Sequence, residues 1–564
     1  MNPTAFYQPG VPTEIDPPTD SLVQIIEQAA ARGGKLVATD FFGRTTTFAE
    51  LRDQILRVAE GLRRLGVRRG DRVAIILPNC PQHIVAFFAI LRLGAYVVEH
   101  NPLYTPRELR HMFEDHSARV VIAWDAAVKN LRALPADIEF DHVISVNLLK
   151  EFPLVKRLAL KLPVPSLRAM RKKLTEKVKN TITWETLLTS RPLKRSYPRP
   201  GVTDIAAIQY TSGTTGLPKG AILTHSNLYT NARQAEAWMP DIRDDEEVFY
   251  AVLPFFHGYG LTYMLYSLVK RARLHLFPTF DVNMVLDVAK KNPPTVLCAV
   301  PPIFEALTLG AKRRRISLKT ARWSMSGAMS LSLDVTQAWE NLTGGKLIEG
   351  YGMTEASPVA LGNPFHEARR IGTIGLPFPS TQVKVVDADD WTKEVPTGER
   401  GELLIRGPQV FQGYWNNPTE TERTLLPGGW LASGDIVTQD AEGFVTVVDR
   451  KKELIITSGF NISPTEVELV LKSHPAIQDA AVVGLPHPHS GEMVAAGVVA
   501  AEGHTIDQDE IRAFCKTRLA GYKVPRRIIA LDSFPKSLLG KVLRAEVKAI
   551  LVHSVGTKPL GTKP

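Results

Sequence analysis

The sequence predicts an α/β fold built on mostly parallel sheets, and three segments carry that prediction. Residues 47–66 place apolar side chains at helical spacing and end at Gly66, a typical helix-closing residue. Residues 72–79 form a short apolar run that ends in a turn, as a buried strand would. Residues 86–98 read as a helix, a glycine and a second strand. Helices that alternate with buried strands in this way indicate a mostly parallel sheet.

The pattern changes twice further along the chain. Residues 205–210 form another apolar run that leads directly into a loop rich in Ser, Thr and Gly. From about residue 380 to 450, short β-like runs are separated by Gly, Pro and Asp turns, and the last hundred or so residues return to α/β alternation. We therefore predict an N-terminal domain over 1–450, with its β-rich portion at 380–450, and a C-terminal domain over 451–564.

Composition indicates an ordinary globular enzyme in a reducing compartment. The chain has 564 residues, enough for about two to four structural units. Its hydrophobic content is 44% and its mean hydropathy is −0.06. The three cysteines are far apart and form no CxxC pair, which argues against disulfides and a cysteine zinc site. The first residues do not resemble a signal peptide, and no apolar run is long enough to span a bilayer, so a cytoplasmic location is expected.

The net charge of +10 is concentrated in one segment. Residues 150–180 contain ten basic and two acidic side chains, interleaved with apolar ones and interrupted by Pro153, Pro163 and Pro165. Because the positive charge is confined to one segment, it does not predict nucleic-acid binding by the whole molecule. Its composition fits short helices on an anionic membrane surface, which would place the protein at the inner face of the cell membrane. The alternatives are a solvated basic excursion and a segment packed on its own domain.

The clearest chemical signal is the segment Thr211–Gly220, TSGTTGLPKG, which follows an apolar strand. Its glycines allow the backbone to approach an anion closely, its hydroxyl and N–H groups can bond phosphate oxygens, and Lys219 adds a cation. A polar surface loop is the alternative interpretation. A P-loop is excluded, because that motif requires Ser or Thr directly after the lysine, and Gly220 stands there.

This loop resembles the phosphate-binding signature of the acyl-adenylate-forming superfamily, which includes acyl-CoA synthetases, peptide-synthetase adenylation domains and luciferase. Further similar segments follow in the family's order between about residues 40 and 545. These are PFFHGYG (254–260), SGAMS (326–330), EGYGMTE (349–355), GWLASGD (429–435), VDRKKELIITSGFNISPTEVE (448–468) and PKSLLGKVLR (535–544). The resemblance implies a large layered α/β N-terminal domain with a β-barrel portion, and a small mobile α/β C-terminal domain.

The resemblance also implies a set of functional residues. Tyr351 would stack on adenine, Asp435 and Arg450 would hold the ribose, and Glu355 with Thr211 would bind Mg²⁺. Lys541 would bring the substrate carboxylate and the α-phosphate together, and Lys452 lies at the family's hinge position. The complete set implied for ATP is Thr211, Ser212, Gly213, Thr214, Thr215, Gly216, Lys219, Gly327, Ala328, Glu349, Gly350, Tyr351, Gly352, Thr354, Asp435, Arg450, Lys452 and Lys541; those implied in catalysis are Lys541, Glu355, Thr354 and Arg450.

Two further sites follow from the same resemblance. The acyl pocket would be formed by His257, Gly258, Gly327 and Gly352, with His257 at its entrance. We do not expect His257 to act as a base, because a carboxylic acid is already ionised at neutral pH. Ser458, Gly459 and Phe460 would line the tunnel for coenzyme A after the C-terminal domain has rotated.

Among these enzymes the sequence is most similar to bacterial long-chain fatty acid–CoA ligases, as the segments at 99–108 and 448–468 and the basic insertion indicate. Gly429, Ser433 and the pair Glu99–His100 depart from the usual pattern and leave the acyl chain length open. The expected reaction joins a fatty acid to coenzyme A with ATP and Mg²⁺, giving acyl-CoA, AMP and pyrophosphate. The alternatives are an aryl or medium-chain ligase, an enzyme that loads a carrier protein, and a silent lipid- or nucleotide-binding protein at membranes. A homodimer is compatible with the sequence.

Overall fold

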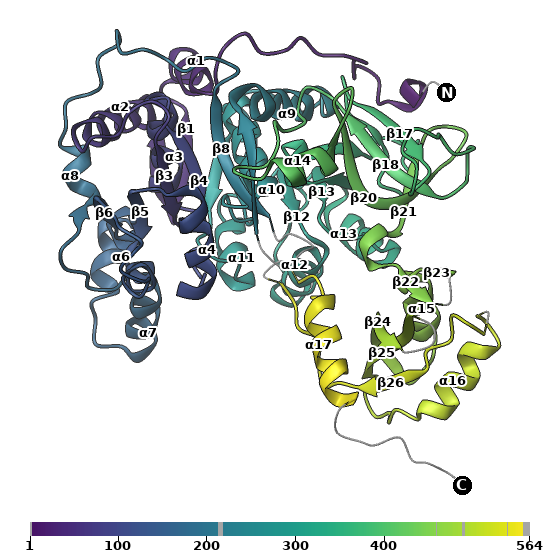
Figure 1. Cartoon of the computed structure of the whole chain (residues 1–564). Helices are drawn as coiled ribbons and strands as arrows, with labels where there is room; N and C mark the ends of the chain where they lie inside the picture. The colour runs from purple at the N-terminus through teal and green to yellow at the C-terminus, as the bar shows by residue number, and fades with distance from the viewer. Residues whose placement is uncertain are drawn as a thin grey trace. The chain divides into compact units, whose positions relative to one another are not determined.

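Two sheets made mainly of parallel strands organise the first 380 residues (Figure 1). The computed structural model describes residues 3–211, 218–457, 460–487, 491–519, 521–537 and 540–555. By internal contacts the chain divides into one unit of residues 1–383, 404–432 and 442–444, and a second of 384–403, 433–441 and 445–564. The predicted division at residues 450 and 451 remains a prediction.

The first sheet has nine strands, and the strands at its centre are parallel. In spatial order they are β16 (Leu376–Pro377), β15 (Val359–Gly362), β14 (Lys346–Gly352), β13 (Trp323–Ser326), β12 (Val296–Ala299), β10 (Val248–Ala251), β11 (Arg273–Leu276), β1 (Val37–Phe41) and β2 (Arg44–Thr47). Antiparallel pairing occurs only towards its ends, between β1 and β2 and among β14, β15 and β16, as far as the described residues show.

The second sheet has seven strands, parallel except for the final hairpin. Its order is β7 (Ile182–Thr183), β6 (His142–Val146), β5 (Val120–Trp124), β3 (Arg72–Ile76), β4 (Tyr96–Glu99), β8 (Ile205–Thr211) and β9 (Lys219–Thr224). The hairpin of β8 and β9 places Thr211 opposite Lys219, so the two ends of the glycine-rich loop meet across one pair of strands.

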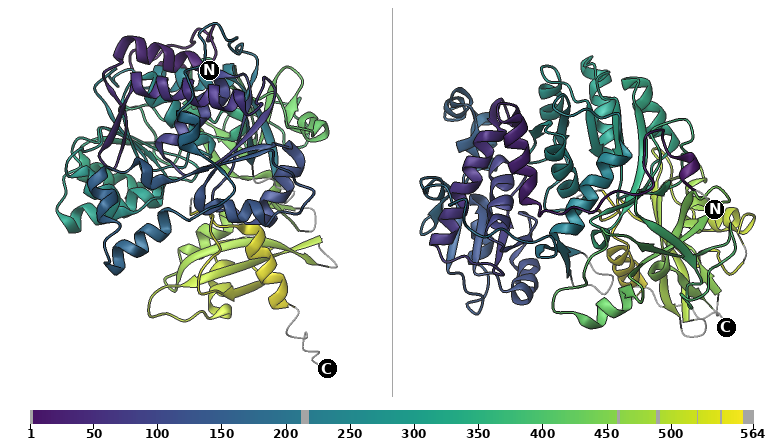
Figure 2. Two further views of the ribbon diagram at one scale, coloured as in Figure 1. Left: turned by 90° about the vertical axis from the view of Figure 1, so that its left-hand side faces the viewer. Right: turned by 90° about the horizontal axis from the view of Figure 1, so that it is seen from above.

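Helices cover both sheets, and Figure 2 shows that they form layers with the strands. The longer helices of this unit are α1 (Val23–Gly33), α2 (Phe48–Arg64), α3 (Pro81–Arg92), α4 (Pro106–His116), α7 (Pro165–Leu174), α9 (His225–Trp238), α10 (Gly258–Val269), α12 (Pro301–Arg314) and α13 (Leu333–Thr343). The shorter ones are α5 (Val128–Arg132), α6 (Leu154–Ala159), α8 (Trp184–Leu188), α11 (Val282–Ala289) and α14 (Pro418–Thr424).

Local sequence chemistry explains the predicted helix at 47–66. Thr47 and Glu50 form a capping box, which satisfies free N–H groups at the start of α2. Gly66 follows the end of the helix with a φ of 97°, a conformation that glycine adopts without the strain of a side chain. Helix α3 packs on α2, and its residues are buried all round, as expected of a helix enclosed in the protein. The predicted elements at 72–79, 86–98 and 205–210 are confirmed as β3, α3 with β4, and β8.

The β-rich texture of residues 380–450 is also confirmed. This region forms a five-stranded sheet of β17 (Gln382–Val386), β18 (Gly401–Arg406), β20 (Trp430–Gln439), β19 (Leu425–Leu426) and β21 (Val445–Arg450), in which β21 pairs with β20. The strands of this sheet contribute residues to both units.

The described residues between 455 and 555 form the predicted second α/β core. Its strands are β23 (Phe460–Ile462), β22 (Ile455–Thr457), β25 (Gly491–Ala500), β24 (Ile477–His487) and β26 (Arg527–Ala530), and its helices are α15 (Pro464–Lys472), α16 (Gln508–Lys516) and α17 (Arg544–Val555). Alternation along β24 explains the layering: Val482 joins the cluster that includes residues of α15 and α16, whereas Val483 joins the cluster that includes residues of α17. In the described part of the chain, no helix combines the length and apolar character needed to cross a bilayer.

Candidate active site

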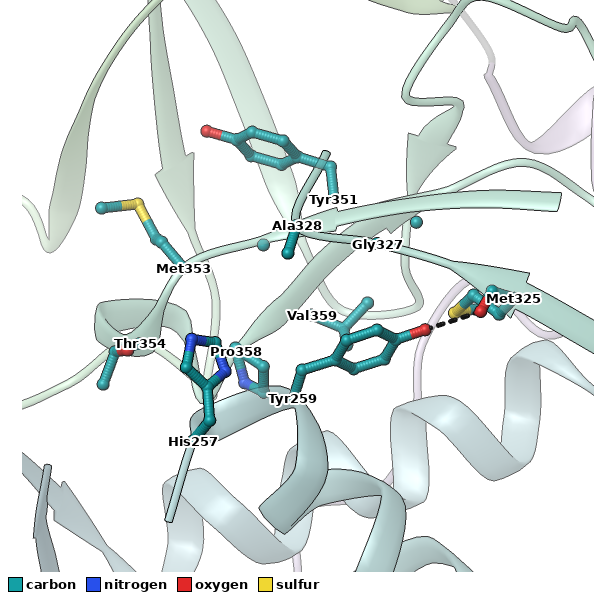
Figure 3. Close-up of a pocket in the computed structure, with 12 residues that line it drawn as sticks. His257, Tyr259, Met325, Gly327, Ala328, Tyr351, Met353, Thr354, Pro358 and Val359 are labelled. Atoms are coloured by element: carbon teal, nitrogen blue, oxygen red, sulfur yellow. Dashed lines mark hydrogen bonds between the residues drawn. The ribbon is translucent and has the colours of Figure 1, made fainter. Parts of the chain in front are cut away.

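Three separated motifs meet at one pocket in the first unit (Figure 3). It is lined by His257, Tyr259, Met325, Gly327, Ala328, Gly350, Tyr351, Gly352, Met353, Thr354, Pro358 and Val359. Seven of these residues belong to the predicted site, namely His257, Gly327, Ala328, Gly350, Tyr351, Gly352 and Thr354. The other five, Tyr259, Met325, Met353, Pro358 and Val359, were not predicted individually, although Tyr259 and Met353 lie inside motifs that the sequence marks.

The sheet topology explains why these motifs converge. Gly327 and Ala328 follow the end of β13, and Tyr351 and Gly352 form the end of the neighbouring strand β14. The two strands are parallel, so their carboxyl ends lie at the same edge of the sheet, where open α/β sheets commonly bind ligands. Helix α10 starts at Gly258 and brings His257 and Tyr259 to the same place.

Two glycines allow the backbone and a ring to come close around the pocket. A Cβ atom on Gly352 would lie 2.0 Å from the carbonyl oxygen of Pro358, and that oxygen also accepts a 2.9 Å hydrogen bond from the N–H of Met353. A Cβ atom on Gly327 would lie 2.9 Å from the ring of Tyr259. Tyr259 is held in turn by its hydroxyl, which donates a 2.9 Å hydrogen bond to the carbonyl of Met325.

Two residues other than glycine adopt left-handed backbone conformations at this site. Ala328 has a φ of 64° and Ser357 has a φ of 68°, which costs about 1 kcal/mol for a residue with a side chain. The carbonyl of Ser357 accepts a 2.7 Å hydrogen bond from the hydroxyl of Thr262. Strain of this kind is typical of functional sites, where the surrounding structure maintains it.

The predicted residues Glu355 and Lys219 are linked by two residues that the motifs did not mark. The hydroxyl of Tyr414 donates a 2.6 Å hydrogen bond to Oε1 of Glu355. Lys219 forms an ion pair with Glu420, and its ammonium lies 5.5 Å from the centre of the Tyr414 ring. All four residues are largely shielded from solvent, so the charges interact strongly. The sequence offered only their residue types, an aromatic and an acidic residue within 413–424, as an indication of this role.

Burial raises the pKa of Tyr414, and the neighbouring Glu355 carboxylate raises it further. Tyr414 therefore keeps its proton at neutral pH and acts as a hydrogen-bond donor. The backbone of the same segment is tied to the site as well. The N–H of Phe411 donates a 2.8 Å hydrogen bond to the carbonyl of Glu355, and the N–H of Trp415 donates a 2.7 Å bond to that of Gly220.

His257 is one of the residues that line the pocket, and its place at the entrance of an acyl site stays a prediction. Its ring is accessible through the pocket, and the protein that surrounds it lowers its pKa, so the imidazole is neutral at pH 7. Gly258 does not line the pocket, although it was predicted to. A Cβ atom there would lie 3.3 Å from Oε1 of Gln209, a contact closer than ordinary van der Waals packing.

Glu349 also lies away from the pocket lining. Its carboxylate is buried and accepts a 3.2 Å hydrogen bond from the N–H of Leu331. Burial raises the pKa of Glu349 to about 7, against the effect of that hydrogen bond.

The unusual pair Glu99–His100 divides between two buried clusters on opposite sides of the strand. Oε1 of Glu99 lies 3.0 Å from Nε2 of His83, whose ring packs edge-on against Phe255 of the PFFHGYG motif. Nε2 of His100 lies 3.0 Å from Nε2 of His116. The Glu99–His83 pair therefore packs against the motif that contains His257.

The second unit holds the remaining predicted residues that the structure describes. Asp435 on β20 pairs in register with Arg450 on β21. The loop before α17 is tight: the hydroxyl of Ser537 accepts a 3.2 Å hydrogen bond from the N–H of Lys541, whose carbonyl accepts a 2.7 Å bond from the N–H of Ser537. Arg544 anchors the end of this loop by ion pairs with Glu453 and Glu468.

Several predicted residues lie outside the described part of the chain. They are Ser212, Gly213, Thr214, Thr215 and Gly216 of the glycine-rich loop, and Ser458 and Gly459 of the tunnel segment. For Arg450, Lys452 and Phe460 the structure describes the backbone alone. Among the residues that are described, no three His, Cys, Asp or Glu side chains form a cluster that could hold a metal ion by themselves.

Comparison with known proteins agrees with this arrangement. Residues 26–415 match the AMP-binding enzyme family, and residues 466–541 match the AMP-binding enzyme C-terminal domain. The chain is 36% identical to a long-chain-fatty-acid–CoA ligase of Bacillus subtilis (strain 168) over 544 residues, which cover 96% of each protein. It is 35% identical to a feruloyl-CoA synthase of Amycolatopsis sp over 508 residues, 90% of this chain and 94% of that protein.

Solved structures show the same fold. The crystal structure of a benzoate CoA ligase from Burkholderia xenovorans LB400 matches with a TM-score of 0.77 at 26% identity, covering 94% of this chain and 99% of that one. The long match to the family model and the identity to the ligases extend over nearly the whole sequence. The chain therefore belongs to the AMP-binding enzyme family and is a ligase that forms acyl-CoA, with ATP and coenzyme A as its substrates.

Proposed function

We propose that this ligase activates a long-chain fatty acid as acyl-AMP and then transfers the acyl group to coenzyme A. The observation that carries the proposal is the pocket at the carboxyl ends of β13 and β14, whose lining by Tyr259, Met325, Met353, Pro358 and Val359 is mainly apolar. An apolar wall suits a hydrocarbon chain. The 36% identity to a long-chain-fatty-acid–CoA ligase supports the same substrate class.

The first step requires charge neutralisation rather than a base. A carboxylate oxygen of the acid attacks the α-phosphorus of ATP, the bond to the β-phosphate oxygen breaks, and pyrophosphate leaves. Both reactants are anionic, so cations and N–H groups aimed at the α-phosphate lower the barrier. We assign this role to Thr354, to Lys219 and the loop that precedes it, and to Lys541. When ATP binds, Lys219 would leave its ion pair with Glu420 and bind a phosphate oxygen instead.

We assign further residues to the nucleotide. Tyr351 would stack on adenine, and Gly327 and Ala328 would allow the ring to approach the backbone. Asp435 would accept hydrogen bonds from the ribose hydroxyls, supported by Arg450, with Lys452 as the hinge.

Glu355 and Thr211 offer oxygen atoms to Mg²⁺. One carboxylate, one hydroxyl and the phosphates fit a cation that is usually bound in enzymes by few protein ligands and by substrate oxygens. When bound, Mg²⁺ would neutralise phosphate charge. Tyr414 would orient the Glu355 carboxylate for that role by its 2.6 Å hydrogen bond.

The second step exchanges the adenylate for a thioester. The sulfur of coenzyme A attacks the acyl carbonyl, the bond between carbonyl carbon and phosphate oxygen breaks, and AMP leaves with the bonding electrons while the thiol releases its proton. Lys541 is needed in the first step only, so we propose that the C-terminal domain over 451–564 rotates between the steps. Ser458, Gly459 and Phe460 would then line the path of the thiol arm.

An aryl acid is the second candidate substrate, since the chain is 35% identical to a feruloyl-CoA synthase. The acid-dependent exchange of pyrophosphate into ATP, measured over saturated acids of increasing length and over cinnamic and benzoic acids, tests the choice. A fatty acid–CoA ligase should prefer the long saturated acids and release AMP only with coenzyme A. Preference for the aryl acids would replace the proposal, exchange without any transfer to coenzyme A would favour a carrier-loading enzyme, and no exchange with any acid would favour a silent protein.

A further inference from the structure

Helices α6 and α7 form a surface that the fold itself does not use. They lie beside the ends of β5 and β6 in the first unit (Figure 1), where α6 has no buried residue. From Leu154 to Leu174 the sequence contains seven basic residues and no acidic one. Pro163 and Pro165 separate the two helices, and Pro165 starts α7, where a missing N–H group costs nothing.

The segment is firmly attached to its unit by other residues. Phe152, 3% exposed, stacks against Phe42 with ring centres 4.7 Å apart. Leu160 and Leu174 are also buried, and the indole N–H of Trp124 donates a 3.0 Å hydrogen bond to the carbonyl of Leu174. These anchors account for the packing of the segment on its own domain. Several other apolar residues of the segment, among those whose side chains the structure describes, remain exposed.

Five large apolar side chains in eleven residues point into solvent instead. They are Leu154, Val155, Leu158, Leu162 and Val164, with exposed fractions from 43% to 79%. Leu154, Val155 and Leu158 share one face of α6, because residues three and four positions apart are neighbours on a helix. In the described part of the chain, no other stretch of this length exposes more than two large apolar residues. Such a concentration indicates an interaction surface.

The charges around this surface identify the partner. Lys161, Arg168, Arg171 and Lys172 are exposed beside the apolar residues. We propose that the α6–α7 surface docks the protein on an anionic lipid bilayer. Basic side chains would contact lipid phosphates while the leucines and valines enter the interface. A nucleic acid would satisfy the charges and leave the apolar side chains in water, so the bilayer explains both observations.

The surface argument is independent of the acyl substrate, although the two proposals agree. A long-chain acid partitions into bilayers, so docking would shorten its route to the pocket. The test therefore measures binding of the whole protein to lipid, with no reference to catalysis.

Sedimentation with vesicles of phosphatidylcholine, with and without phosphatidylglycerol, tests the proposal. The salt concentration is varied from about 0.01 to 1 M, because the electrostatic screening length falls from about 30 to 3 Å over this range. We expect binding that requires phosphatidylglycerol and weakens with salt. The triple variant Lys161→Gln, Arg168→Gln and Arg171→Gln should bind about 100-fold more weakly, since each basic residue contributes about 1 kcal/mol near an anionic surface. The triple variant Leu154→Gln, Leu158→Gln and Leu162→Gln should bind at least about tenfold more weakly even at low salt.

The matched control replaces three exposed bases elsewhere, Lys312→Gln, Arg313→Gln and Lys319→Gln. It should bind vesicles like the unchanged protein, and the thermal unfolding midpoint of every variant should stay the same because all these side chains are exposed or half-exposed. No binding at low salt, or equal losses in the control and the α6–α7 variants, would overturn the proposal. Tight salt-dependent binding to a DNA or RNA duplex that the leucine variant leaves intact would assign the surface to nucleic acid instead.

Discussion

Tyr414 holds the carboxylate of Glu355 through a 2.6 Å hydrogen bond, from a position 59 residues further along the chain. The same ring lies under the ammonium of Lys219, so one aromatic residue contacts both charged groups that we assign to the triphosphate and its cation. Neither contact could be anticipated from the motifs, because residue 414 lies between two of them.

Tyr414→Phe should lower kcat/KM for ATP about tenfold, the effect of one lost hydrogen bond to a charged group. It should also raise the Mg²⁺ concentration needed for half-maximal rate, because the Glu355 carboxylate loses its fixed orientation. Steady-state rates at varied ATP and Mg²⁺ measure both. Tyr266→Phe is the matched control, since the buried hydroxyl of Tyr266 has no hydrogen-bond partner among the described residues. Identical kinetics in the two variants would exclude a positioning role for Tyr414.

Gly352→Ala should abolish adenylate formation. Its added methyl group would lie 2.0 Å from a backbone oxygen, which cannot rotate away like a side chain. The strand end or the turn at Pro358 must shift, and the pocket is built from both. Trapping of acyl-AMP by mass spectrometry, together with circular dichroism, reports chemistry and folding separately. Gly201→Ala is the control, because its methyl group would meet only the Asp204 carboxyl at about van der Waals distance. Normal acyl-AMP formation by Gly352→Ala would show that the pocket tolerates this shift.

Glu349→Gln should change how stability depends on pH. Burial raises the pKa of this carboxyl to about 7, so between about pH 4.5 and 7 the folded state retains a proton that the unfolded state has lost. The contribution of Glu349 to the free energy of unfolding therefore falls as pH rises through this window, by about 1.4 kcal/mol per pH unit. Glutamine can still accept the hydrogen bond from Leu331 and has no charge to bury. The thermal unfolding midpoint of Glu349→Gln, relative to that of the unchanged protein, should therefore rise as pH increases from about 5 to 8. A constant difference across this range would contradict the assignment.

Lys541→Ala should reduce adenylate formation by about three orders of magnitude and spare thiolysis of preformed acyl-AMP. Its charge helps only while the carboxylate and the α-phosphate approach each other. Single-turnover assays of the two half-reactions separate the effects. Lys548→Ala is a suitable control, because Lys548 lies on α17 and pairs with Glu492. Equal losses in both half-reactions would refute a step-specific role for Lys541.

Gly459→Leu should have the opposite profile. A bulky side chain in the path of the thiol arm would block acyl-CoA formation, while pyrophosphate exchange continues near its normal rate. Comparing exchange with acyl-CoA release over the same acid measures this directly. If exchange fails as severely as the overall reaction, the residue has a structural role and the proposed tunnel is wrong.

The sequence by itself determined the α/β fold class and the elements at 47–66, 72–79, 86–98 and 205–210, and its resemblance to a known family pointed to seven residues that line the pocket. Hydrophobic periodicity, helix caps and turn glycines act over a few residues, so they can be recognised in a short stretch of sequence. Thr47 and Gly66 show this for α2. The motifs around Gly327 and Tyr351 were identified by their resemblance to those of a known family. Only the tertiary structure decided which distant side chains meet. Met325 joins the pocket because β13 and β14 are parallel and end at one edge, and Pro358 and Val359 join because the antiparallel strand β15 starts there. Tyr414 reaches Glu355 because its segment bridges to β9 at Ala221 and bonds to the Glu355 carbonyl through Phe411. The exposure of Leu154, Val155 and Leu158 was likewise decided by packing, since Phe152, Leu160 and Leu174 took the buried positions and left those three in solvent.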